Sequence, residues 1–227
     1  MTVFARGKEK IGYDKNPLSF LFTRQVKHLI GDGRHEVDRL NALVEHLTDG
    51  SRPLPHLYPG EKHKAETRAA SPYVCIAPAS VWFTKQWPEE NWIGLIKSLA
   101  SDERVYLIGA PGDVGLCERI VKAAGRGEIL AGKLSLLGTA ALMQGATMNY
   151  VNDSAPLHIA SAMNAPVTAI FCSTVPAFGF GPLRENGRIV ETMEKLDCRP
   201  CGLHGYKACP KGHFKCALSI DSRALIV

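Results

Sequence analysis

The chain has 227 residues, 45% of them hydrophobic and 22% charged, and a formal net charge of +5, which is typical of a globular protein with its own core. No apolar run approaches the ~20 residues that span a bilayer, and the start lacks a secretory signal, so we expect a cytoplasmic protein. The scattered basic residues exclude a basic stripe for nucleic acid and fit a phosphorylated small molecule or an anionic membrane face.

The first fifty residues predict only fragments of a domain. Residues 11–17 are typical of a strand end and a turn, and residues 35–47 have the spacing of one amphipathic helix. Since so few elements cannot close a core, we expect residues 1–50 to be the remnant of an N-terminal domain. Residues 51–71, rich in Pro, Lys and Glu without periodicity, are expected to be an interdomain linker.

From residue 72 onward, short apolar strands alternate with helices. The predicted strands are 73–77, 105–108, 128–130, 148–151 and 167–172, and the predicted helices are 88–100, 114–124, 136–145 and 156–163. Strands that are apolar throughout are typical of a parallel sheet covered on both faces, so we predict an α/β fold with a doubly wound, Rossmann-like parallel sheet. Such sheets bind ligands at the carboxyl ends of their strands, here the loops 78–87, 109–112 and 152–156.

The segment 152–158, Asn-Asp-Ser-Ala-Pro-Leu-His, joins a predicted strand to a predicted helix. Asp153 or Ser154 suits a helix N-cap, and Pro156 suits the first turn. One interpretation is simply a well-capped helix. The other is a phosphate site, in which backbone N–H groups and the helix dipole bind the anion and His158 adds a donor or a positive charge.

The two other loops also have a structural and a functional interpretation. Lys85, between Trp82 and Trp87, is either a solvated loop lysine or a group that neutralises a diphosphate. Asp113, at the end of Gly-Ala-Pro-Gly-Asp, is either a helix cap or a carboxylate for ribose hydroxyls.

The seven cysteines fall into two groups. Cys75, Cys117 and Cys172 lie in apolar or helical contexts and are expected to be buried, inert thiols. The tail holds four more cysteines, with His204 and His213 nearby: Cys198, Cys201, Cys209 and Cys216. Four thiolates suit a structural zinc site, but only one pair has the tight C-x2-C spacing, which favours reduced cysteines in a loop-rich lid. We therefore predict no metal.

Together these motifs resemble glycosyltransferase family 9, the ADP-heptose:lipopolysaccharide heptosyltransferases. The resemblance rests on Lys85-x-Trp87-Pro88, Gly109-Ala110-Pro111, Lys133-x-Ser135-Leu136 and Asn152-Asp153-Ser154-x-x-x-His158-x-Ala160. Residues 13–17 and 35–39 resemble the end of that family's N-terminal domain. The tail 198–216 resembles its cysteine-bearing C-terminal segment.

The resemblance implies a two-Rossmann-domain (GT-B) architecture, of which residues 72–227 would be the nucleotide-sugar-binding donor domain. It implies inverting transfer of heptose from ADP-heptose to the lipopolysaccharide inner core, peripherally at the inner membrane, with no metal or other cofactor. Lys85 and Asp153 would be the catalytic residues. The implied donor-binding residues are Ser80, Lys85, Asp113, Asp153, Ser154, Ala155 and His158.

Two departures from the family pattern leave an alternative open. Ala155 stands where the family usually has glycine, which lets backbone approach a phosphate closely. The family's catalytic base is an acidic residue early in the N-terminal domain, before the segments that match here, and Asp14 lies in a different motif. The alternative is a non-catalytic nucleotide-binding remnant or interaction module, with a zinc-stabilised tail.

Overall fold

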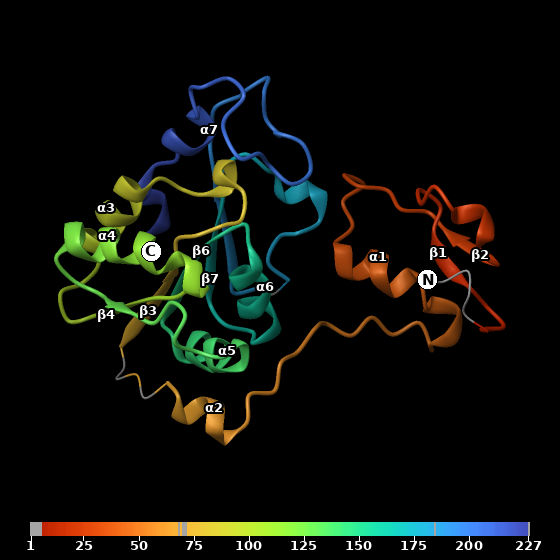
Figure 1. Cartoon of the computed structure of the whole chain (residues 1–227), viewed down its shortest axis with the longest axis horizontal. Coiled ribbons are helices and arrows are strands. Elements are labelled where there is room, and N and C mark those ends of the chain that lie inside the picture. Colours follow the sequence, from red (N-terminus) through yellow and green to blue (C-terminus); the bar gives the residue numbers. More distant parts are fainter. Residues whose placement is uncertain (1–5, 68, 70–71, 184, 227) are drawn as a thin grey trace. The chain divides into compact units, whose positions relative to one another are not determined.

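The computed structural model describes residues 6–67, 69, 72–183 and 185–226 and divides into two compact units (Figure 1). Unit 1 consists of Met1–Leu54 together with Ala177–Phe180, and unit 2 of Pro55–Pro176 and Gly181–Val227. Among the described residues, no helix combines the length and apolarity needed to cross a membrane.

Unit 2 contains a six-stranded sheet in which every pair of neighbouring strands is parallel. Its strands are β3 (Tyr73–Ala77), β4 (Arg104–Leu107), β5 (Glu128–Ile129), β6 (Met148–Asn152), β7 (Val167–Phe171) and β8 (Gly187–Glu191). The spatial order is β5-β4-β3-β6-β7-β8, so the chain winds outward from the centre in both directions. This is the doubly wound Rossmann order, which confirms the predicted fold class, and it places a topological switch point between β3 and β6.

Both faces of the sheet are covered by helices. The helices of unit 2 are α2 (Glu61–Ala65), α3 (Glu89–Ser98), α4 (Val114–Ala124), α5 (Leu136–Gly145), α6 (Ala155–Ala162) and α7 (Lys215–Leu218). Val74 and Ile76 of β3 join a core cluster with α3 and α4, whereas Cys75 joins a cluster with α5 and α6. Because successive strand side chains point to opposite faces, a strand between two helical layers must be apolar at every position.

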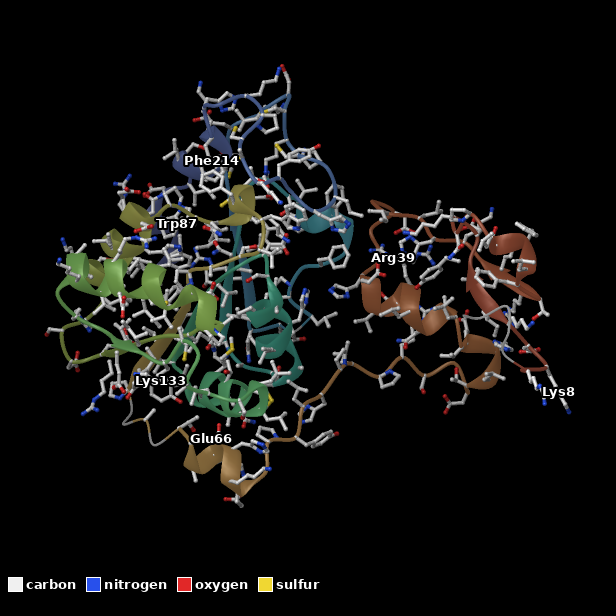
Figure 2. All side chains as sticks on the ribbon, in the orientation of Figure 1. Lys8, Arg39, Glu66, Trp87, Lys133 and Phe214 are labelled. Atoms are coloured by element: carbon white, nitrogen blue, oxygen red, sulfur yellow. The ribbon has the colours of Figure 1, made fainter. Side chains whose placement is uncertain are left out.

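The sequence pattern did not predict two elements of unit 2, α2 and β8. The predicted linker contains α2. Glu66, directly after α2 (Figure 2), accepts hydrogen bonds from the backbone N–H and the hydroxyl of Ser135, at 3.3 and 3.0 Å. Ser135 is the N-cap residue of α5. A helix of five residues is too short to give a periodic signal. Strand β8 was also missed, because it lies at the sheet edge with only Val190 fully buried.

Unit 1 contains two short parallel strands, β1 (Ile11–Tyr13) and β2 (Arg24–Val26), and the helix α1 (Glu36–Ala42). The prediction of one helix over residues 35–47 was wrong, since α1 ends at Ala42 and a separate 3-10 turn follows at Glu45–Leu47. Three apolar residues that suggested a longer helix are exposed: Leu40, Val44 and Leu47. Because they are not buried against a core, no tertiary packing stabilises an extension of α1 beyond Ala42.

Candidate functional site

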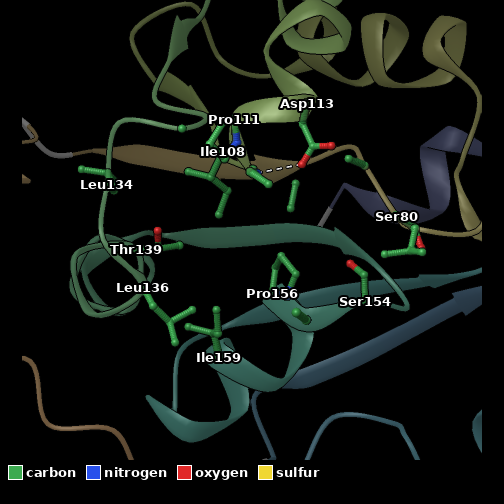
Figure 3. A pocket seen from close by; sticks show the side chains of 17 residues that line it. Ser80, Ile108, Pro111, Asp113, Leu134, Leu136, Thr139, Ser154, Pro156 and Ile159 are labelled. Carbon is green, nitrogen blue, oxygen red and sulfur yellow. Dashed lines mark hydrogen bonds between the residues drawn. The ribbon is translucent and has the colours of Figure 1, made fainter.

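Three loops at the carboxyl ends of β3, β4 and β6 meet around a pocket of about 480 Å³ (Figure 3). The pocket is lined by Ala77, Ala79, Ser80, Val81, Ile108, Gly109, Ala110, Pro111, Asp113, Gly132, Leu134, Leu136, Thr139, Ser154, Ala155, Pro156 and Ile159. Its volume is in the range of small-molecule sites, and it lies at the switch point of the sheet.

The lining separates into an apolar and a polar part. Leu134, Leu136 and Ile159 come from the loop before α5, from α5 and from α6 (Figure 3). The polar side chains of the lining are those of Ser80, Asp113, Thr139 and Ser154 (Figure 3). A flat, largely apolar group with one polar edge is the ligand that such a lining accommodates.

Asp113 closes the turn before α4 and also lines the pocket, so its predicted contact with ribose hydroxyls stays a prediction. Its Oδ2 accepts a hydrogen bond from the backbone N–H of Ala110 at 2.7 Å, which closes the turn before α4. A Cβ on Gly109 would lie 2.8 Å from the same oxygen, so the tight turn requires glycine there. A carboxylate has about four acceptor positions, so a capping Asp113 keeps capacity for hydroxyl groups in the pocket that it lines.

The start of α6 is not capped by a side chain. Ser154 is the N-cap residue in extended conformation, but its hydroxyl donates to the carbonyl of Asn152 at 3.3 Å and accepts no bond from the first turn. The first-turn residues Ala155 and Pro156 line the pocket. This is the arrangement in which a helix N-terminus binds an anion. His158 lies one turn further on, exposed and outside the pocket lining, so its predicted phosphate contact stays a prediction.

Lys85 and Asp153 form an ion pair, with 2.7 Å between Nζ and Oδ2. The side chains are only 15% and 6% exposed, which excludes the interpretation of Lys85 as a solvated loop lysine. Thr174 also donates its hydroxyl to the Asp153 Oδ2, at 2.6 Å. The pair therefore presents a fixed cation and a fixed carboxylate at the carboxyl end of β6, where Asp153 lies between the last residue of β6 and Ser154, the N-cap residue of α6.

A family model described as glycosyltransferase family 9 (heptosyltransferase) matches residues 1–205. The chain belongs to glycosyltransferase family 9. Among curated proteins of this kind, lipopolysaccharide heptosyltransferase 1 of Pseudomonas aeruginosa is 28% identical over 194 residues, which cover 82% of this chain and 52% of that protein. The chain spans about half the length of the curated heptosyltransferase 1 relatives that it matches.

Solved structures agree on the fold of the family. A family 9 glycosyltransferase from Veillonella parvula has a TM-score of 0.73 at 21% identity, over 83% of this chain and 57% of that one. An Escherichia coli heptosyltransferase solved with ADP has a TM-score of 0.61 at 27% identity, over 79% and 58% of the two chains. Both likenesses include the doubly wound sheet that carries the pocket.

The sequence did not point to the structural role of two polar residues beside the pocket. Asn152 is buried, and its amide donates to the Pro78 carbonyl at 2.8 Å and accepts from the Trp87 N–H at 3.0 Å, which fixes the loop after β3. Thr174 holds Asp153, and its position two residues after a predicted strand was the signal that could have found it. Trp87 itself is buried edge-to-face against Trp92 in the core and does not form a wall of the pocket.

The cysteines divide as predicted with one exception, because Cys216 of the tail is buried in α7 and does not lie in a loop. Cys75, Cys117 and Cys172 are buried, and burial raises the pKa of each thiol. In the tail, burial, with the neighbouring thiols, raises the pKa of Cys216 to about 11. Burial also acts to raise the pKa of Cys209, but backbone N–H groups of residues 211–214 outweigh it and lower that pKa.

Within the part of the chain that the structure describes, no group of three or more His, Cys, Asp or Glu is arranged to hold a metal. Cys198 Sγ lies 3.7 Å from His213 Nε2, and the Cys201 thiol donates to the Cys198 carbonyl at 3.2 Å. Metal analysis of the purified, dialysed protein separates the two interpretations of the tail. One retained equivalent per chain would support structural metal, and none would support reduced thiols.

Proposed function

We propose that the pocket binds the ADP part of ADP-heptose and that the chain is the donor-binding part of a lipopolysaccharide heptosyltransferase. One observation carries the proposal: the uncapped start of α6 and the Asp113 loop line one pocket at the switch point of the sheet, and the Lys85–Asp153 pair lies next to Ser154 without lining that pocket itself. Family membership and the likeness to an Escherichia coli heptosyltransferase solved with ADP support it.

In the proposed complex, each part of the donor meets a matching part of the site. The adenine ring lies in the apolar part beside Leu136, and the ribose hydroxyls bind Asp113. The diphosphate lies at the start of α6, beside Ser80, Ser154 and Ala155 and within reach of His158. Because Ala155 has a methyl group where the family usually has glycine, the phosphate binds the neighbouring N–H groups from slightly further out.

Lys85 and Asp153 act where the sugar is transferred. The leaving group is a nucleoside diphosphate, so negative charge grows on its oxygens as the bond to heptose breaks. The Lys85 ammonium and the N–H groups of α6 are fixed in place before the reaction and stabilise that charge without a metal. Asp153, held by Thr174, accepts from a heptose hydroxyl and keeps the sugar oriented for inverting attack from the opposite face. No described residue is assigned as the base.

The proposed acceptor is the inner core of lipopolysaccharide, which the protein would meet in the cytoplasm at the periphery of the inner membrane. The formal net charge of +5 favours both the anionic donor and an anionic membrane surface. Neither a cofactor nor nucleic acid enters the proposal.

We expect ADP to bind the purified chain at least about tenfold more tightly than UDP or GDP, a difference of about 1.4 kcal/mol. The reason is the pocket's largely apolar lining, which suits adenine and offers few partners for the polar edges of uracil or guanine. Isothermal titration with the three nucleotides measures this. Binding of UDP or GDP, with no binding of ADP at millimolar concentration, would sink the donor assignment.

A transfer assay with ADP-heptose and heptose-deficient lipopolysaccharide tests the enzymatic part of the proposal separately. Release of ADP that depends on the acceptor would identify an active heptosyltransferase. Donor binding without acceptor-dependent release would support the non-catalytic nucleotide-binding module instead.

A further inference from the structure

Arg199, near the start of the cysteine-rich tail, binds the end of β7. The Arg199 Nε donates to the Cys172 carbonyl at 2.8 Å, and its Nη2 donates to the carbonyls of Phe171 and Thr174 at 3.1 and 2.8 Å. The same Nη2 pairs with the carboxylate of Glu191 on β8 at 2.5 Å. One guanidinium thus fixes the backbone carbonyls of residues 171, 172 and 174. The last of these belongs to Thr174, whose hydroxyl donates to Asp153.

The same tail segment also binds the loop that carries Lys85. Thr84 is buried, and its hydroxyl oxygen accepts from the Tyr206 N–H at 2.7 Å and from the buried Ser173 hydroxyl at 3.0 Å. The Thr84 N–H donates back to the Tyr206 carbonyl at 3.1 Å. Further along, the Cys201 N–H donates to the Ser173 carbonyl at 2.8 Å. Residues 199–206 therefore bind Thr84, which precedes Lys85 in the chain, and Thr174, which donates to Asp153.

We propose that residues 199–206 are a positioning element of the donor site, which holds Lys85 and Asp153 at the distance and direction that the diphosphate-sugar needs. Arg199 acts through Thr174 on Asp153, and Gly205–Tyr206 acts through Thr84 on Lys85. Misplacement by 1 Å can cost about a hundredfold in rate, so such bracing has functional value. The inference rests on the proposed function, because it assigns a role toward the same donor.

Gly205 offers a direct way to disturb this element. It is buried, has a φ of +80°, and a Cβ there would lie 2.8 Å from the Thr84 Oγ1 and 3.1 Å from the Lys85 Cγ. Gly212, in the same tail, has a φ of +71° and no atom within 4 Å of its Cβ position. Replacement of either glycine by alanine strains a left-handed backbone by a similar amount, but only Gly205→Ala presses on the loop of Lys85.

The experiment compares Gly205→Ala and Gly212→Ala with the wild-type chain by titration with AMP and ADP-heptose. We expect Gly205→Ala to bind ADP-heptose about tenfold more weakly while its AMP affinity stays within about twofold, and Gly212→Ala to match wild type for both ligands. Equal behaviour of the two variants, or an equal loss of AMP and ADP-heptose binding in Gly205→Ala, would overturn the positioning role. A wild-type chain that binds neither ligand would instead refute the proposed function.

A second variant covers the case in which Gly205→Ala does not fold. Thr84→Val keeps the shape of the side chain but removes the oxygen that accepts from Tyr206 and Ser173. We expect it to reduce ADP-heptose affinity selectively, and Thr84→Ser, which keeps the hydroxyl, to restore it. If Thr84→Val binds AMP and ADP-heptose as wild type does, the positioning role is wrong.

Discussion

Replacing Lys85 by methionine is expected to weaken binding of ADP-heptose by about tenfold to a hundredfold while AMP binding changes little. A hydrogen bond to a charged group contributes about 1.5–3 kcal/mol, and this substitution keeps the aliphatic part of the side chain while it removes the charge. Titration of Lys85→Met with both ligands measures the difference. An unchanged affinity for ADP-heptose would contradict the placement of Lys85 at the diphosphate-sugar.

The same substitution carries a stability cost that the sequence did not suggest. The Asp153 side chain is only 6% exposed, so Lys85→Met leaves a buried carboxylate whose charge is no longer paired and which keeps only the hydrogen bond from Thr174. Removing one partner from a buried ion pair lowers the free energy of unfolding by about 3–5 kcal/mol. The double variant Lys85→Met with Asp153→Asn removes both charges. We expect it to melt at a higher temperature than the single variant while it binds ADP-heptose no better.

An exposed ion pair provides the control. Arg119 of α4 binds Glu89 of α3 at 2.5 Å, but its side chain is 61% exposed. Since exposed pairs contribute about 0–1 kcal/mol, Arg119→Met is expected to leave both the melting temperature and donor binding close to wild type. If the double variant Lys85→Met with Asp153→Asn melts at a lower temperature than Lys85→Met, the unpaired charge of Asp153 is not the cause of the lost stability.

The sequence predicts the fold well because the fold depends on local patterns. Residues 73–77 are apolar at every position, and β3 has the same bounds because it lies between two helical layers. Helix α4 ends where predicted because Gly125 takes a left-handed conformation with a φ of +77° at its C-cap. Once the strands are parallel, their carboxyl ends must share one edge, which is why the three predicted loops meet at one pocket.

The details of the site depend on contacts between distant residues, which no local pattern encodes. Thr174 and Asp153 are 21 positions apart, and Tyr206 and Thr84 are 122 apart. Lys85 has the same sequence neighbours whether it is solvated or buried, so only the packed structure decides between the two. The same holds for Trp87, which the sequence places beside the lysine and the fold places in the core.

Replacing Arg39 by methionine is expected to destabilise unit 1 by about 3–5 kcal/mol, since it removes a fully buried charge from its partners. The Arg39 side chain is 0% exposed. Figure 2 labels it on α1. Its guanidinium binds two carboxylates and three backbone carbonyls, those of Glu36, Asp32, Leu29, Arg34 and Phe178. Hydrogen exchange over residues 29–42 and 177–180 measures the effect locally, which matters because a chain of two units need not unfold in one step.

Two comparisons determine whether charge pairing is the cause. Arg52 pairs with Asp38 and Glu45 at 3.9 and 3.4 Å but is 57% exposed, so Arg52→Met should leave exchange in these segments near wild type. Burial acts to raise the pKa of Glu36, but hydrogen bonds from Arg39 and His28 outweigh it and hold that pKa below its ordinary value of 4.5. A lowered folded-state pKa contributes stability that is present above the ordinary value and lost as the pH falls through the folded value. The difference in hydrogen-exchange protection between wild type and Arg39→Met should therefore shrink below about pH 4.5. A difference that does not change with pH would mean that lost packing, and not the ion pair, causes the destabilisation.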